Sequence, residues 1–132
     1  MATVELEIPS RSAYVGVVRL ALASLGRSVG MDEEAVDDFK IAVSEACANA
    51  VLSQEAQGVK APIEVGWSDD DGRVVVEVGD RGLVYDPDSV DPSDTQRLRL
   101  AMSVALLRSL VDECRFAPRA GGGMCTRLVV DV

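Results

Sequence analysis

Apolar residues recur every three or four positions along three stretches of the chain, and this spacing predicts three helices. The stretches span residues 12–29, 32–57 and 96–111. In each of them the apolar residues form a stripe along one face, as in helices that pack against a core. Asp32 opens the second stretch and two glutamates follow it, and acidic groups stabilise a helix N-terminus. We therefore expect the second helix to begin at Asp32.

Five shorter runs of alternating or consecutive apolar residues predict strands. They span residues 3–8, 63–67, 73–78, 114–117 and 126–132. The turn between the second and third runs is acidic and ends in Asp71-Gly72, which favours a hairpin, and Gly121-Gly122-Gly123 lies between the last two runs. One sheet with all three helices on one face accommodates this order economically. The predicted fold is therefore an α+β two-layer sandwich with a mixed but mostly antiparallel sheet.

Length and composition are those of a globular protein. The 132 residues predict a single domain over 1–132, with 48% apolar and 27% charged residues. The formal net charge of −9 argues against direct nucleic-acid binding and against docking to an anionic membrane surface. A basic protein partner, or a metal–nucleotide held among carboxylates, suits this charge, but simple solubility accounts for it equally well.

Histidine is absent from the sequence, which excludes histidine-dependent nucleophilic catalysis and histidine-ligated metals. The three cysteines are Cys47, Cys114 and Cys125, and no two of them form a Cys-x-x-Cys pair. Neither a disulfide framework nor a zinc site is therefore indicated. Reduced thiols, no signal-peptide pattern and no window of membrane-spanning length together predict a cytoplasmic protein.

Two polar pairs are candidates for chemistry. Glu45 and Asn49 lie one turn apart on the second predicted helix, at the edge of its apolar stripe, where they either line a pocket or remain ordinary surface residues. Asp80 and Gly82 directly follow the third predicted strand. An aspartate there can accept a hydrogen bond from an exocyclic amine and a glycine lets a flat ring approach, but the same residues also make ordinary turns.

Together these segments resemble a known family. The sequence VSEACANAV at 43–51 resembles the N-box of the GHKL ATP-binding superfamily, and VEVGDRG at 76–82 resembles its first glycine box. The N-box wording and the short length are similar to the anti-sigma-factor branch, whose members are serine protein kinases. LLRSLVDECRF at 106–116 is similar to the same branch. The resemblance covers nearly the whole chain and implies the Bergerat ATP-binding fold.

The resemblance also implies roles for individual residues. Glu45 would be the general base for the attacking hydroxyl, and Asn49 would bind the Mg²⁺ that bridges the phosphates of ATP. Asp80 would bind the adenine amine and Gly82 would make room for the ring. Arg19 resembles the partner-binding arginine of the family, although a solvated helix arginine is an equal interpretation. The implied cofactors are ATP and Mg²⁺, and the implied partners are a sigma factor and an anti-sigma antagonist, with a homodimer also compatible.

Three departures from the family pattern concern the phosphate end of the site. The second glycine box, expected just before the third helix, reads Ala101-Met102-Ser103-Val104, so both glycines are replaced by small residues. Arg97 and Arg99 lie just upstream, and with Ala101 and Ser103 they remain candidates for holding phosphate at a helix N-terminus. Gly123-Met124 stands where the family has Gly-Thr. The histidine that often follows the N-box in the family is replaced here, at about position 53, by Ser53. Adenine recognition is thus expected to be intact and phosphate recognition to be eroded.

Three functional hypotheses follow. The first is an ATP-dependent anti-sigma regulator that phosphorylates a serine of its antagonist. The second is a non-catalytic partner-binding module on the same fold, and the third is an unrelated α+β domain in which an N-box-like sequence arose by chance.

Overall fold

The computed structural model describes residues 2–89, 91 and 93–132. Within these residues the chain forms every helix and strand that the hydrophobic pattern predicts. The elements are β1 (Ala2–Ile8), a short 3₁₀ helix η1 (Ser12–Tyr14), α1 (Val15–Ser28), α2 (Glu33–Ala56), β2 (Ile63–Asp70), β3 (Arg73–Gly79), α3 (Thr95–Leu110), β4 (Glu113–Pro118) and β5 (Met124–Asp131).

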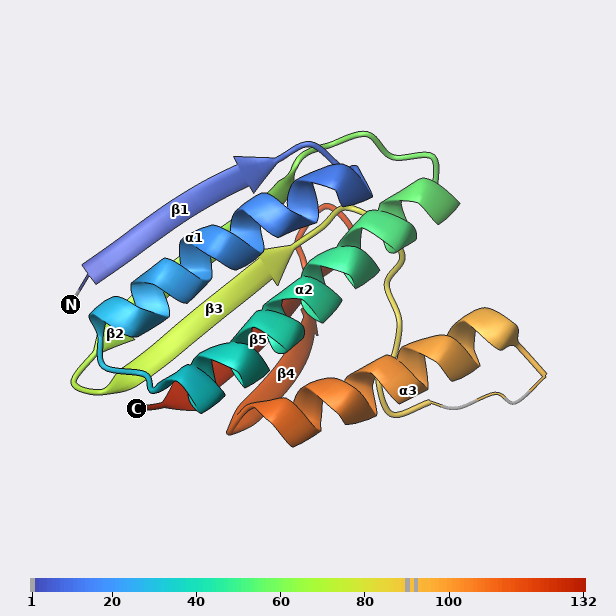
Figure 1. The fold of residues 1–132 in the computed structure, drawn as a ribbon. Coiled ribbons are helices and arrows are strands. Elements are labelled where there is room, and N and C mark those ends of the chain that lie inside the picture. The colour runs from blue at the N-terminus through green and yellow to red at the C-terminus, as the bar shows by residue number, and fades with distance from the viewer. Residues whose placement is uncertain (1, 90, 92) are drawn as a thin grey trace.

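The strands form one five-stranded sheet in the order β1-β2-β3-β5-β4, and each neighbouring pair is antiparallel. All three helices lie on the same face of this sheet (Figure 1). The predicted two-layer α+β fold is therefore confirmed, and the described sheet is antiparallel throughout rather than mixed. Among the described residues, no helix combines the length and apolar character needed to cross a bilayer.

The hairpin between β2 and β3 is tighter than the sequence predicts. Only Asp71 and Gly72 form the turn, and both have positive φ angles, 51° and 81°, as a two-residue hairpin requires. The sequence predicts residues 68–70 as part of this turn. Instead they continue β2, where β3 pairs with all three and β1 pairs with Ser68 and Asp69.

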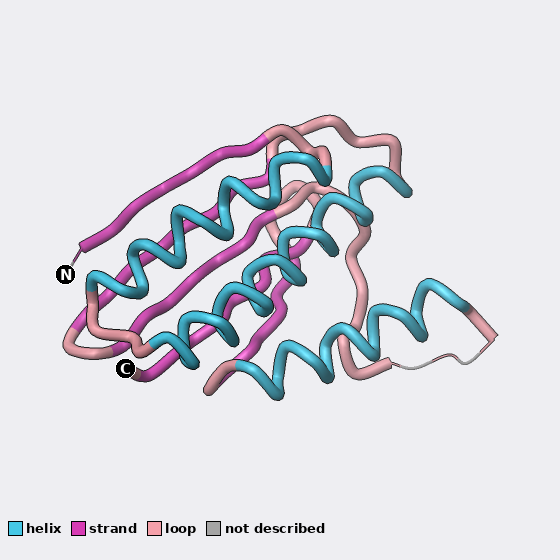
Figure 2. Tube along the Cα trace, in the orientation of Figure 1, coloured by secondary structure: helices cyan, strands magenta, loops and turns pink. Residues whose placement is uncertain are grey.

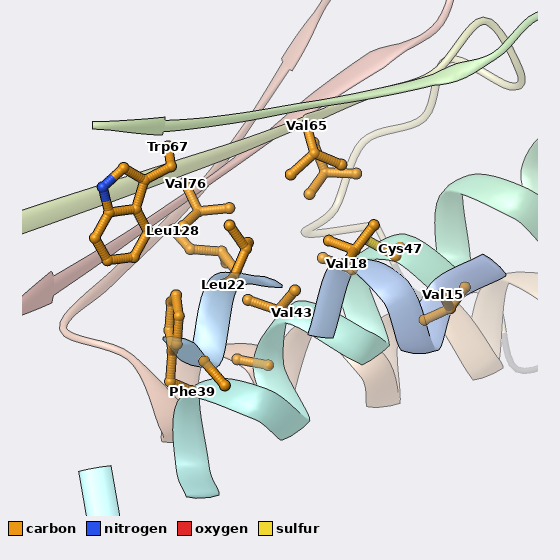
Figure 3. Close-up of a cluster of buried hydrophobic side chains, with 14 of the residues drawn as sticks. Val15, Val18, Leu22, Phe39, Val43, Cys47, Val65, Trp67, Val76 and Leu128 are labelled. Carbon is orange, nitrogen blue, oxygen red and sulfur yellow. The ribbon is translucent and has the colours of Figure 1, made fainter. Parts of the chain in front are cut away.

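Side chains from α1 and α2 form the core with the inner face of the sheet (Figure 3). Phe39 of α2 is only 1% exposed, and its ring meets that of Trp67 edge-on, with centroids 5.9 Å apart. Cys47 is fully buried on the same helix, as its place on the apolar stripe predicts, and burial raises the pKa of its thiol to about 12. This cysteine therefore remains a neutral packing residue.

A side-chain cap holds the start of α2, whereas the segment before α3 lacks regular structure in its described part. The Asp32 side chain accepts a 2.8 Å hydrogen bond from the Ala35 amide and caps α2 where the sequence predicts its start. The segment 83–94 before α3 has no helix or strand in its described part (Figure 2). Residues 90 and 92 of this segment lie outside the described residues. An ion pair of 3.0 Å between Asp88 and Arg108 connects this segment to α3.

The packing of Phe39 predicts a large and local stability effect. Phe39→Ala should lower the free energy of unfolding by about 3–5 kcal/mol, because it leaves a cavity beneath the sheet. Ile41→Ala on the same helix should cost no more than about 0.5 kcal/mol, since Ile41 is 50% exposed. Urea unfolding followed by Trp67 fluorescence measures both, and equal losses in the two variants would contradict this packing.

Candidate functional site

One face of α2 carries the candidate residues in successive turns. Glu45, Asn49 and Ser53 are spaced four residues apart, so their side chains stack along one side of the helix. Glu45 is half-buried, and Asn49 is buried with 9% exposed. α3 lies beside the first two turns of this face, and the loop that leaves β3 reaches the third. The site is therefore organised by α2.

A hydrogen-bond network joins this face to α3. The Ser103 hydroxyl donates to Oε1 of Glu45 at 2.6 Å and accepts from Nδ2 of Asn49 at 2.5 Å. Nη1 of Arg99 donates to Oδ1 of Asn49 at 3.3 Å. Arg99 and Ser103 are four residues apart, so both reach α2 from one face of α3. Four of the residues singled out from the sequence thus lie within one network.

The substituted glycine box does not lie where the family pattern predicts. α3 begins at Thr95, where Oδ1 of Asp94 accepts hydrogen bonds from the amides of Gln96 and Arg97. The segment 101–104 is therefore inside the helix rather than before it. Alanine and serine favour a helix interior over glycine by up to about 1 kcal/mol each, which lets α3 extend through the box. The expectation that Ala101 lies at a helix N-terminus is accordingly wrong.

Ala101 also faces away from the network. It is two residues from Ser103, about 200° around the helix. Together with Tyr85 and Leu100 it lines a cavity of about 190 Å³ between α3 and the segment 83–89. Burial, and to a smaller extent the negative charge of Asp80, raise the pKa of Tyr85 to about 12, so this tyrosine is a neutral phenol. The structure thus separates Ala101 from the network around Asn49, while Arg97 lines the same cavity as Ala101.

Asp80 ends β3 as a buried carboxylate with 5% of its surface exposed. Its Oδ1 accepts hydrogen bonds from the amides of Gly82 at 2.8 Å and Met124 at 3.3 Å. Burial raises the pKa of Asp80, and these two hydrogen bonds and the nearby arginines 119 and 81 only partly oppose that shift. No partner for Oδ2 occurs among the described residues, so this oxygen can accept a hydrogen bond from a ligand.

Gly82 is required by a close contact with α2. A Cβ atom at this position would lie 2.7 Å from the carbonyl carbon of Ser53 and 2.9 Å from the amide nitrogen of Gln54. The last turn of α2 alone is enough to require glycine here, and the role of Gly82 in making room for a ring stays a prediction. The contact fixes the loop after β3 directly against the helix that carries Glu45 and Asn49.

Two neighbouring residues of α2 hold this loop, although the sequence predicted no contact for either. Oγ of Ser53 accepts a 2.8 Å hydrogen bond from the Leu83 amide. Gln54 is fully buried, accepts from the Arg81 amide at 2.8 Å and donates to the Ala61 carbonyl at 2.6 Å. Because Gln54 is a polar residue on an apolar stripe, the sequence did contain a signal for it. The signals for Ser53 were its position four residues after Asn49 and the family histidine that it replaces.

The end of β3 is also held from its other side. Nη1 of Arg119 donates to the Asp80 carbonyl at 3.0 Å, while Nη2 pairs with Glu64. Gly123 has a φ of 91°, and a Cβ there would lie 2.6 Å from the Cα of Arg81, so only glycine fits. These contacts leave the Asp80 side chain little freedom of orientation.

Arg19 lies apart from this network but shares a groove with Glu45. The groove lies between α1 and α2, has a volume of about 870 Å³, and is lined by Arg19, Lys40 and Glu45 among others. The nearby Val17, Leu20 and Ile41 are exposed apolar residues. A protein segment seated in the groove would contact Arg19 and reach the carboxylate of Glu45.

Mg²⁺ does not fit the arrangement described here. The ion requires oxygen ligands in octahedral geometry, but the amide oxygen of Asn49 already faces the positive guanidinium of Arg99. Among the described residues, no three histidine, cysteine or acidic side chains converge on one point. Asn49 cannot bind the ion while it accepts the hydrogen bond from Arg99.

The raised pKa of Asp80 predicts how stability depends on pH. Its carboxyl contributes stability below the pKa of unfolded aspartate, about 3.9, and loses that contribution as pH rises through the higher folded value. The difference in unfolding free energy between wild type and Asp80→Asn should therefore be most favourable to wild type near pH 4 and should fall towards pH 7. Urea titrations across this range measure this difference in unfolding free energy. A difference that grows with pH would contradict the raised pKa of the buried Asp80 carboxyl.

The sequence matches a known protein family and is similar to characterised relatives. A profile of the histidine kinase-like ATPase domain matches residues 8–130. The serine-protein kinase RsbW of Bacillus velezensis is 32% identical over 127 residues, which cover 89% of this chain and 79% of the relative. The serine-protein kinase RsbW of Bacillus subtilis is 30% identical over the same length and shares.

Solved structures share the fold. The RsbU and RsbW domains of Rv1364c from Mycobacterium tuberculosis align over 99% of this chain with a TM-score of 0.74 and 23% identity, although the chain spans only 32% of that longer protein. The SiaB–SiaC complex from Pseudomonas aeruginosa aligns over 96% of this chain and 88% of the matched one, with a TM-score of 0.71 and 14% identity. At these identities the likeness concerns the fold alone.

Proposed function

Because this chain belongs to the family of histidine kinase-like ATPase domains, we propose that it is an ATP-binding anti-sigma regulator that phosphorylates a serine of an antagonist protein. Its membership excludes an unrelated fold with a chance N-box. The observation that best supports the proposal is the 2.6 Å hydrogen bond from a serine hydroxyl to Glu45. The carboxylate thus has the environment and geometry to accept a hydroxyl proton.

In this proposal the hydroxyl of the antagonist takes the place of Ser103 beside Glu45. The serine oxygen then bonds to the γ-phosphorus of ATP, the bond to ADP breaks, and Glu45 receives the hydroxyl proton. Positioning and charge stabilisation provide most of the rate in phosphoryl transfer, so a single carboxylate suffices as base. The groove between α1 and α2 gives the antagonist a route to Glu45.

The remaining roles follow from the same geometry. Oδ2 of Asp80 would accept a hydrogen bond from the adenine amine, while Oδ1 remains bound to the Gly82 and Met124 amides. Arg19 would contact the protein partner, either the antagonist or a sigma factor, because an exposed guanidinium pairs well with carboxylates. Mg²⁺ would bind Asn49 only after Arg99 has left the amide oxygen.

A second candidate function has specific support. Glu45 and Asn49 are both engaged by residues of α3 rather than free for a substrate. The same fold could therefore bind its partner through the α1–α2 groove without transferring phosphate. This partner-binding module differs from the kinase in needing no nucleotide for partner binding.

Replacing the proposed base separates the two candidates. Glu45→Gln should reduce serine phosphorylation by about 10²–10⁴-fold while leaving ATP affinity nearly unchanged, because the base acts on the acceptor hydroxyl. Radiolabelled ATP with a cognate antagonist measures transfer, and calorimetry measures binding. Glu55→Gln, which changes an exposed carboxylate of the same helix, is the matched control and should retain activity. No transfer by the wild type, with partner binding that is independent of nucleotide, would instead establish the module.

Asp80→Asn tests adenine recognition. The amide can offer a donor where the adenine amine needs an acceptor, so ATP affinity should fall more than tenfold, in line with about 1.5–3 kcal/mol for a hydrogen bond to a charged group. The fold should remain intact because an amide oxygen can still accept from Gly82 and Met124. Asp70→Asn at the exposed end of β2 serves as control. Equal ATP affinity in wild type and Asp80→Asn would refute the role of Asp80.

A further inference from the structure

We propose that Ser103 and Arg99 form a gate over the phosphate end of the site, which must open before ATP and Mg²⁺ can bind. This inference rests on the proposed function, since it takes Glu45 and Asn49 to belong to the nucleotide site. It adds that residues of α3 control whether ATP can enter that site.

The gate engages the polar atoms that substrate and metal would need. The Ser103 hydroxyl donates to Oε1 of Glu45 and accepts from Nδ2 of Asn49, and Arg99 donates to Oδ1 of Asn49. Ser103 is 5% exposed, so its hydrogen bonds are shielded from water. Shielded bonds to a carboxylate are stronger than exposed ones. A ligand at this end of the site must therefore replace existing bonds rather than occupy free groups.

The substituted glycine box makes this gate possible. A glycine at 103 would have no hydroxyl to offer, and one at 101 would disfavour the helical path that projects residues 99 and 103 towards α2. With alanine and serine there, α3 runs unbroken from Thr95 to Leu110. The chain that lacks these glycines thus has a continuous helix, and residues of that helix form hydrogen bonds with Glu45 and Asn49.

The first half of α3 is weakly anchored apart from this gate. Its buried residues in the described structure are Ser103, Val104 and Leu107, all in the second half of the helix. The segment before the helix has no regular structure in its described part. Segments with few buried apolar contacts open at low free energy. Breaking the bond of Arg99 is therefore the main cost of moving this half of α3 away from α2, and Ser103 lies where this half meets the anchored one.

Charge gives the gate a means of opening. The guanidinium of Arg99 beside Asn49 repels a divalent cation but attracts phosphate. Arg99 is largely exposed and can change rotamer without disturbing the core. An incoming triphosphate offers Arg99 a stronger partner than the amide oxygen, so nucleotide binding would release Asn49 from α3.

The test compares Ser103→Ala with Ser109→Ala. Ser109 lies on the exposed face of the same helix, where its hydroxyl donates to the Leu106 carbonyl. If the closed gate lowers the fraction of binding-competent protein, loss of one such hydrogen bond should tighten Mg-ATP binding by about tenfold. Calorimetry with Mg-ATP measures this for each variant. Ser109→Ala should match the wild type.

Hydrogen–deuterium exchange without nucleotide provides an independent measurement. Amides of α3 should exchange about tenfold faster in Ser103→Ala than in wild type, while those of β3 and β5 remain unchanged and show that the fold is intact. Faster exchange of α3 with no ATP binding by any variant would support the gate and refute the nucleotide function. Equal exchange together with unchanged or weaker ATP binding in Ser103→Ala would overturn the gate and leave the proposed function standing.

Discussion

The packing of α2 against the sheet is the constraint on which the rest of the structure depends. Val36, Phe39, Val43 and Val51 are almost completely buried along one face of this helix. Any rotation of α2 about its axis would expose several of these side chains at about 1.5–3 kcal/mol each. The polar edge of the helix therefore has a fixed direction, towards α3 and the loop that leaves β3.

Buried polar groups extend this constraint to the loop. Gln54 lies in the core and must form hydrogen bonds there, and it finds them in the Ala61 carbonyl and the Arg81 amide. The loop is thereby drawn against α2, where only glycine fits at position 82. Arg119 and Gly123 hold the same strand end from the other side. Asp80 is thus positioned by packing and hydrogen bonding before any ligand arrives.

Much of this could be predicted from the sequence because it depends on local periodicity. The apolar stripes of residues 12–29 and 32–57 and the Asp71-Gly72 turn predict helices, a hairpin and a two-layer fold. Periodicity likewise predicts the third helix over 96–111, close to the observed Thr95–Leu110, whereas the family pattern wrongly puts the second glycine box before it, because Ala101 and Ser103 allow the helix to continue. Contacts such as Ser103 with Glu45 join residues 58 positions apart, and no local spacing reveals them.

Whether α2, α3 and the loop after β3 form one nucleotide site can be tested by a single NMR titration. Mg-ATP is added to ¹⁵N-labelled protein while the side-chain amide of Asn49 and the backbone amides of Gly82 and Ser103 are followed. The account predicts that all three shift along one saturation curve, because adenine contacts the loop while phosphates displace α3 from α2. Shifts confined to other parts of the chain, or different affinities for Gly82 and Asn49, would contradict it.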